Sequence, residues 1–313
     1  MLAMLSRFKK KKVPNYPTKR EFEKLEEMVD GHHIRLNNIF VYHELELTPY
    51  MKLMREVSYE LLKFFDNVCS KYGLEYWLDF GTLLGAVRHG GFIPWDDDLD
   101  VGMLRADYYK FLEAFPKELE RFDLKYIEAW FKEPSWDINS RRWYQINCKY
   151  PEYNGKFVGL DVFPYDFITE YDDDYIPAFH NVVRPAFFKV WKGDVPLNEA
   201  LDATCGRLNL SLTKTDYFIG GVDGGRFYFT SPFKILKTKD LLPLKRIKFG
   251  NYEFSAPNSP ENYISEIYGK DFMKIGKTSK DHGRLNRYKK HENIMELLGE
   301  AKEELLSANR TFE

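Results

Sequence analysis

Two aspartates spaced one residue apart, Asp98 and Asp100, are the side chains of this sequence best suited to hold a metal ion. They lie in residues 96–101 (DDDLDV), and in an extended segment both carboxylates share one face while Leu99 lies on the other. Like charges at this spacing repel, and burial raises the cost, so the pair is either partly protonated or gathered round a cation. Mg2+, or Mn2+ in its place, binds both carboxylates and leaves coordination positions for phosphate oxygens.

The alternative for this acidic run is a solvated turn without function. That is the interpretation we favour for Asp172-Asp173-Asp174 in residues 171–175 (YDDDY), because an isolated run of charges is usually solvated. Residues 96–100 differ in context, because a predicted strand, a Gly-Thr turn and a basic helix end come just before them. This combination favours a functional site.

The residues before the acids are suited to bind phosphate. Residues 74–80 are apolar and predict a buried strand, after which Gly81 and Thr82 turn the chain into a short helix with Thr82 as N-cap. The free backbone N–H groups at such a helix start bind phosphate. Arg88 and His89 are expected to add cationic donors at the other end of the helix.

Three further side chains complete the predicted site. Asp161 lies in the apolar segment 157–163 (FVGLDVF), where an acid is costly unless it is paired or bound to metal, so it is the candidate third carboxylate. A salt-bridged strand residue is the alternative. His89 is a candidate for proton transfer, with a phosphate donor or a structural residue as alternatives. Trp95 is a candidate to stack on a base or sugar, although a core position is favoured.

The sequence resembles the LicD family in residues 80–86 (FGTLLGA), in Arg88-His89 and in residues 91–101 (GFIPWDDDLDV). That family includes phosphocholine transferases and, more distantly, fukutin and fukutin-related protein, and it is similar to nucleotidyltransferases. Asp161 followed by Val-Phe-Pro and the run 268–273 (YGKDFM) also resemble it. The resemblance implies an α+β fold, with a nucleotidyltransferase-like mixed sheet flanked by helices and by additional helical and short-strand elements.

The same resemblance implies a reaction. LicD-like enzymes are expected to take a CDP-linked donor such as CDP-choline and to move its phospho-substituent to a hydroxyl of a cell-surface glycan or lipid-linked glycan. A metal on Asp98, Asp100 and Asp161 would neutralise charge on the leaving group, while Gly81, Thr82, Arg88 and His89 hold the donor phosphates. Two alternatives stay open: transfer of NMP to a small molecule or protein, and a catalytically silent nucleotide-binding protein.

The composition sets outer limits on the function. The 313 residues are 44% hydrophobic, which indicates a globular protein, and the formal net charge of −2 argues against general affinity for nucleic acid. Cys69, Cys148 and Cys205 are far apart, which predicts neither a zinc module nor a disulfide framework and fits a reducing cytoplasm. No apolar run is long enough to predict a membrane-spanning helix.

The N-terminal residues are basic. Arg7 and residues 9–12 form either a solubilising tail or a peripheral contact with an anionic membrane, at about 1 kcal/mol per charge. We therefore expect a cytoplasmic protein, with peripheral association at the inner membrane face as the alternative.

The chain is expected to divide into a lead-in segment (1–47), a LicD-like catalytic domain (48–288) and a C-terminal helix (289–313). The clearest helix runs from Thr48, the predicted N-cap, to Gly73. A basic patch at His282, Arg284 and Arg287 is either a phosphate contact or a surface feature. The remaining expected elements are helices at 19–29, 106–119 and 289–307, strands at 143–149, 157–163 and 227–233, a hairpin around Gly250, and a helix after Ser259.

Overall fold

The structure is a computed structural model that describes residues 18–40, 47–131, 143–150, 153–196, 199–200, 203–204, 207–221, 234–275 and 293–312. The chain divides into two compact units, residues 1–44 with 274–279 and residues 45–273 with 280–313. In the first unit the described helix is α1 (Lys19–Phe40), which is longer than predicted. None of the helices in the described ranges is both long and apolar enough for a membrane crossing. The basic N-terminal residues and the patch at 282–287 lie outside the described residues.

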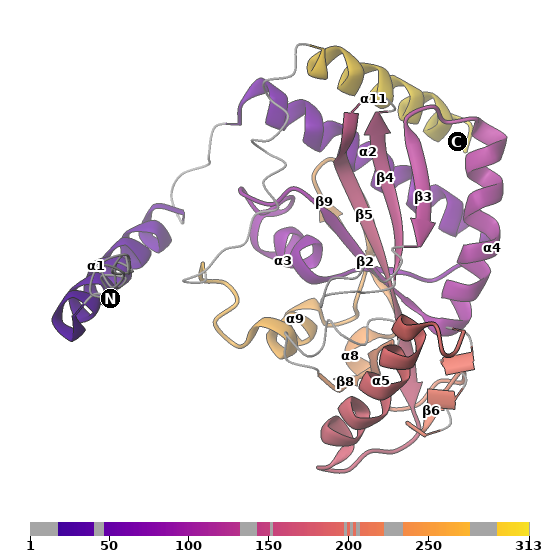
Figure 1. The fold of residues 1–313 in the computed structure, drawn as a ribbon. Coiled ribbons are helices and arrows are strands. Elements are labelled where there is room, and N and C mark those ends of the chain that lie inside the picture. The colour runs from indigo at the N-terminus through magenta and orange to yellow at the C-terminus, as the bar shows by residue number, and fades with distance from the viewer. Residues whose placement is uncertain are drawn as a thin grey trace, which may run out of the picture. The chain divides into compact units, whose positions relative to one another are not determined.

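The second unit is built on a mixed sheet, which confirms the predicted α+β fold (Figure 1). Its main path has the order β1-β2-β5-β4-β3, in which β2 and β5 run parallel and the other pairs are antiparallel. These strands are β1 (Trp77–Leu78), β2 (Leu99–Leu104), β5 (Tyr153–Ile168), β4 (Tyr144–Tyr150) and β3 (Ile127–Phe131). The far end of β5 also pairs with β6 (Leu210–Ser211) and β7 (Tyr217–Gly220), and β7 pairs with β8 (Leu236–Lys237).

One face of this sheet forms the main core. Leu99, Val101 and Met103 of β2 are fully buried, as the alternating pattern predicts, and pair in register with Leu160, Val162 and Pro164 of β5. Three helices pack on this core and contribute buried side chains to it (Figure 1). They are α2 (Pro49–Tyr72), α4 (Arg105–Phe122) and α11 (Ile294–Arg310).

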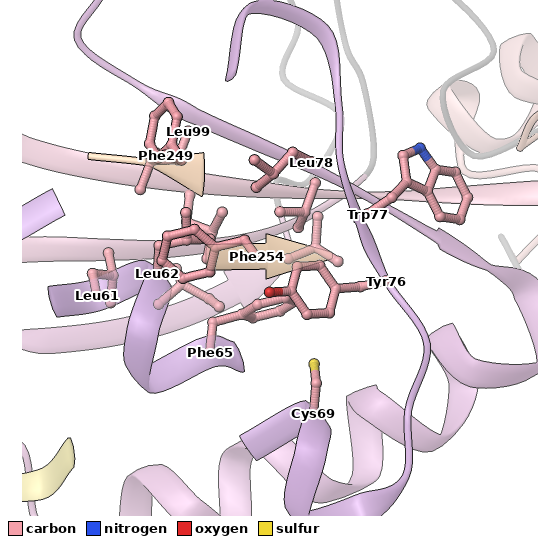
Figure 2. Close-up of a cluster of buried hydrophobic side chains, with 14 of the residues drawn as sticks. Leu61, Leu62, Phe65, Cys69, Tyr76, Trp77, Leu78, Leu99, Phe249 and Phe254 are labelled. Atoms are coloured by element: carbon pink, nitrogen blue, oxygen red, sulfur yellow. The ribbon is translucent and has the colours of Figure 1, made fainter. Parts of the chain in front are cut away.

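The helix α2 confirms the prediction from its caps. Thr48 accepts a hydrogen bond from the N–H of Met51, Pro49 occupies the first turn, and Gly73 ends the helix at φ 62°. Only glycine adopts that left-handed conformation without steric cost. The apolar stripe of α2 faces the sheet and the hairpin of β9 (Lys245–Phe249) and β10 (Tyr252–Ala256), where Figure 2 shows Leu62 and Phe65 near Phe254.

The start of α3 differs from the prediction. The expected strand at 74–80 is limited to the two residues of β1, and α3 (Phe80–His89) begins with Asp79 as N-cap, so the assignment of Thr82 as the cap was wrong. Asp79 accepts the N–H of Phe80 at 2.8 Å. Thr82 lies in the first turn, where its hydroxyl accepts the N–H of Asp100 at 2.8 Å. This bond ties α3 to β2.

The remaining elements pack around the C-terminal end of β5 and around the helix α3. A second, smaller core forms where α5 (Tyr175–Lys192) packs beside the far end of β5, around Ile168, Phe179 and Ile219. The predicted hairpin around Gly250 is confirmed, with that glycine at φ 64°. The helix α8 (Thr238–Leu241) precedes the hairpin in the sequence and α9 (Pro260–Tyr268) follows it. The two helices contact each other, and α9 also contacts α3.

A buried ion pair joins α4 to β5. The guanidinium of Arg105 donates to both carboxylate oxygens of Asp166 at 2.7 Å, and the two side chains are only 7% and 4% exposed. Removal of one partner from such a pair leaves an uncompensated buried charge.

We therefore expect Asp166→Ala to lower the free energy of unfolding by roughly 3–5 kcal/mol. The exposed pair of Lys110 with Asp107 provides the control, since Lys110→Ala should cost less than about 1 kcal/mol. Urea unfolding followed by circular dichroism measures both values. Equal losses in the two variants would contradict a structural role for the buried pair.

Candidate active site

A row of polar residues crosses the face of the sheet opposite the main core. Asp100 of β2 lies beside Asp161 of β5 in parallel register, and Gln145 of β4 lies on the other side of Asp161. The side-chain amide of Gln145 donates to the carboxylate of Asp161. Trp130 of β3 continues the row next to Gln145. Strand pairing thus brings together two of the three predicted metal ligands, which are distant in sequence.

The third predicted ligand, Asp98, lies in the loop before β2 with two more acids. Asp96, Asp97 and Asp98 each offer a carboxylate oxygen within 4.8 Å of the others. Asp97 is only 1% exposed, while Asp96 and Asp98 are half-buried. Ionised carboxylates are acceptors only, and a hard divalent cation with oxygen ligands suits such a set. The residues present therefore fit Mg2+ or Mn2+.

Negative charge converges on Asp100. Burial raises the pKa of this carboxyl well above its usual range, and the nearby carboxylates of Asp98, Asp161, Asp96 and Asp79 raise it further. Each of these neighbours opposes ionisation of Asp100. The negative charge of Asp100 is therefore stable only beside a cation, and without one the carboxyl tends to hold a proton.

The first turn of α3 lies directly against the acids. A Cβ atom added to Gly81 would lie 2.6 Å from Oδ2 of Asp96 and 3.9 Å from Oδ2 of Asp100. Glycine at this position therefore permits the backbone of the helix start to approach the carboxylates. This is the juxtaposition of glycine turn and acids that the sequence predicts, while the binding roles of Gly81 and Thr82 stay predictions.

Asp79, which is not among the predicted site residues, is fully buried beneath the site. Its carboxylate accepts hydrogen bonds from the hydroxyls of Tyr165 at 2.5 Å and Tyr263 at 3.1 Å, and its own N–H donates to the carbonyl of Asp100 at 3.0 Å. Burial raises the pKa of Asp79 to about 6, against the lowering effect of Tyr165, the Phe80 N–H and Tyr263. Asp79 holds the start of α3 in place beside Asp100.

The basic end of α3 is only partly as predicted. Arg88 donates from Nη1 to the carbonyl of Phe272 at 3.1 Å and from Nε to Nε2 of His89 at 3.0 Å. Its guanidinium also lies 5.9 Å from the centre of the half-buried Trp95 ring. Burial of Arg88 lowers the pKa of its guanidinium, while the charges of Tyr268 and Asp96 act to raise it.

His89 does not supply the cationic donor that the sequence analysis expected. Desolvation of its ring and the positive charges of Arg88 and Arg55 lower the pKa of His89 to about 4, although the residue as a whole is exposed. The imidazole is therefore neutral at pH 7, and its Nε2 accepts the Arg88 hydrogen bond. A neutral ring leaves proton transfer open as its role.

Tyr268 is a second site residue that the sequence analysis did not select. The pKa of its hydroxyl is raised well above the ordinary value by desolvation and then by the charges of Asp100, Asp79 and Asp96, although 46% of the residue is exposed. The phenol end therefore approaches the acids while the rest of the side chain reaches the surface. The signal was available in the run YGKDFM, whose Phe272 carbonyl also contacts Arg88.

We predict that His89 titrates far below the ordinary histidine value. Its folded pKa of about 4 lies below the ordinary histidine value of 6.5, so the unfolded chain binds the proton first and His89 reduces stability as the pH falls from 6.5 towards 4. An NMR titration, with His89→Gln to assign the resonance, measures the midpoint. Arg88→Gln should raise this midpoint, and a wild-type midpoint at or above 6.5 would contradict the prediction.

Comparison with known proteins adds independent information. Residues 73–188 match the family model described as LicD/FKTN/FKRP, nucleotidyltransferase domain. The lipopolysaccharide cholinephosphotransferase LicD of Haemophilus influenzae is 42% identical over 73 residues, which is 23% of this chain and 28% of the relative. The human ribitol 5-phosphate transferase FKRP is 38% identical over 69 residues, 22% of this chain and 13% of the relative. An uncharacterized protein of Rickettsia typhi is 46% identical over 59 residues, 19% of each chain. The matches thus span less than a third of each relative.

Proposed function

We propose that this chain, whose residues 73–188 match the model of the LicD/FKTN/FKRP nucleotidyltransferase domain, is a metal-dependent transferase of phospho-substituents. The donor is a CDP-linked compound such as CDP-choline, and the acceptor is a hydroxyl of a glycan or lipid-linked glycan. The metal is Mg2+ or Mn2+. The observation that carries the proposal is the convergence of Asp96, Asp98, Asp100 and Asp161 against the first turn of α3 at Gly81.

The names of the relatives support the type of group transferred. One is a cholinephosphotransferase and another a ribitol 5-phosphate transferase, and both names describe movement of a phosphorylated alcohol. The acids and the glycine of the site lie within residues 73–188, which match the family model. We therefore extend this reaction type to the chain as a proposal.

The reaction requires that the acceptor oxygen attack the phosphorus that carries the transferred group. The bond from this oxygen to phosphorus forms, the anhydride bond to CMP breaks, and the hydroxyl proton passes to a base or to solvent. A divalent cation bound to Asp98, Asp100 and Asp161 supplies positive charge for the donor phosphates.

The residues of the chain itself provide position and charge. Gln145 fixes the carboxylate of Asp161, and Thr82 fixes the backbone of Asp100. The absence of a side chain at Gly81 lets the Asp96 carboxylate lie directly against the first turn of α3. Arg88 is the cation closest in sequence to this turn, and its contacts with Phe272 and Trp95 orient the guanidinium. The neutral imidazole of His89 can accept a proton if the Arg88 hydrogen bond is released.

Product analysis tests the proposed reaction. The protein is incubated with Mg2+, a crude glycan fraction and either CDP-choline or CTP. CMP released from CDP-choline together with choline phosphate on the glycan is the expected result. Pyrophosphate from CTP with CMP on the acceptor would instead indicate NMP transfer, and the absence of any metal-dependent product would indicate a binding protein. Chelation with EDTA should abolish the reaction and added Mg2+ should restore it.

We expect Asp100→Asn to lower turnover by roughly 100- to 1,000-fold or more, because the site loses a charged ligand to the cation. Its melting temperature should stay unchanged or rise, since the repulsion from Asp98 and Asp161 is relieved. Asp173→Asn in the exposed run 172–174 is the matched control and should change neither quantity. Full activity of Asp100→Asn would refute the metal role.

A further inference from the structure

An asparagine on the site face of the sheet is buried without a partner. Asn147 of β4 is 0% exposed, and within the described residues neither Nδ2 nor Oδ1 of its side chain has a hydrogen-bond partner. It lies two residues from Gln145 on the same strand, so both side chains project from the same face. Asn147 therefore lies on the face that carries Asp161.

A second unpaired polar atom comes from the neighbouring strand. Glu128 of β3 is the direct register partner of Asn147. Its Oε2 accepts a hydrogen bond from Nζ of Lys149 at 2.9 Å, but its Oε1 is buried and has no partner among the described residues. Directly opposed residues in antiparallel strands have Cβ atoms about 4.5–5.5 Å apart. The two side chains thus form a single polar site.

This polar site costs stability in the free protein. A buried amide or carboxylate oxygen without a hydrogen bond loses its hydration and receives nothing in return. Most buried polar groups are paired, so an exception calls for a specific explanation. A ligand that supplies the missing donors and acceptors removes the penalty, and the position of the site on the sheet identifies which part of a ligand would reach it.

We propose that Asn147 and Glu128 bind the base of the donor nucleotide and select cytosine. This inference rests on the proposed function, because it concerns the same donor. Asn147 lies about 7 Å along β4 from Gln145, the residue that holds Asp161. A nucleoside whose phosphates are bound at the acids would reach Asn147 by extending along β4. Trp130, which follows Glu128 by two residues on β3, adds an aromatic side chain on the same face.

The two side chains together distinguish cytosine from uracil. The amide of Asn147 has both a donor and an acceptor, so it can pair with the edge of either base. The ionised carboxylate of Glu128 can only accept a hydrogen bond. Cytosine presents an amino donor at C4, whereas uracil presents a carbonyl oxygen that would face the carboxylate. Glu128 therefore favours cytosine and disfavours uracil.

Isothermal titration of the full chain with CDP and UDP in the presence of Mg2+ tests this inference. We expect the wild-type protein to bind CDP at least roughly tenfold more tightly than UDP, because one well-placed hydrogen-bond pair discriminates between bases by about that factor. Asn147→Leu should weaken the binding of both CDP and UDP by roughly 10- to 100-fold, because its amide can pair with either base. Glu128→Gln should shift the preference towards UDP, because an amide can donate to the uracil oxygen.

The control is Asn67→Leu, because the amide of Asn67 already has a partner, Oδ1 of Asn309 at 3.2 Å. It should keep the preference for CDP. The melting temperature of ligand-free Asn147→Leu should be unchanged or higher than that of the wild type, since the substitution breaks no hydrogen bond. An unchanged CDP affinity in Asn147→Leu, an unchanged preference in Glu128→Gln, or equal binding of CDP and UDP by the wild type would overturn this inference alone. Absence of any Mg2+-dependent nucleotide binding by the wild type would overturn the proposed function and this inference with it.

Discussion

Repulsion between carboxylates is the constraint on which the rest of the structure depends. Asp96, Asp98 and Asp161 all oppose the charge of Asp100 near the start of α3, and a chain free to move would separate them. They are held by backbone structure instead. Parallel pairing of β2 with β5 sets Asp100 beside Asp161, and the hydroxyl of Thr82 and the N–H of Asp79 bind the two sides of the Asp100 backbone. The opposite face of the same strands is fully buried in the core, so the strands cannot yield to the repulsion.

Asp79 and Asp100 show how the surroundings decide the role of an aspartate. Asp79 receives hydrogen bonds from Phe80, Tyr165 and Tyr263, each of which stabilises its charged form. Asp100 is surrounded by other acids, which act against its charge. A cation would therefore lower the free energy of Asp100 far more than that of Asp79. The first arrangement is suited to hold a helix in place, and the second is suited to bind metal.

The sequence predicts what depends on local pattern. The caps of α2 and the alternating burial of Leu99, Val101 and Met103 follow from residue types and from the two-residue period of a strand. The role of Asp79 could not be predicted, because its partners Tyr165 and Tyr263 lie 86 and 184 residues away in the sequence. The start of α3 was misplaced because Phe80 adopts φ 38°, a conformation that side chains other than glycine rarely take. The neutral state of His89 likewise depends in part on Arg55 of α2, which is brought near only by the fold.

Strand register links the proposed chemistry to the proposed choice of base. Asp161 and Asn147 project from the same face because β4 and β5 pair regularly from Tyr144 to Cys148, and the register shifts occur only beyond Cys148. A slip of one residue would move Asn147 into the core and bring Ile146 to the site face. Such a slip is opposed by the same core contacts that hold the acids together, since Ile146 and Cys148 are fully buried. One packed core therefore fixes both the carboxylates that would bind the phosphates and the amide that would bind the base.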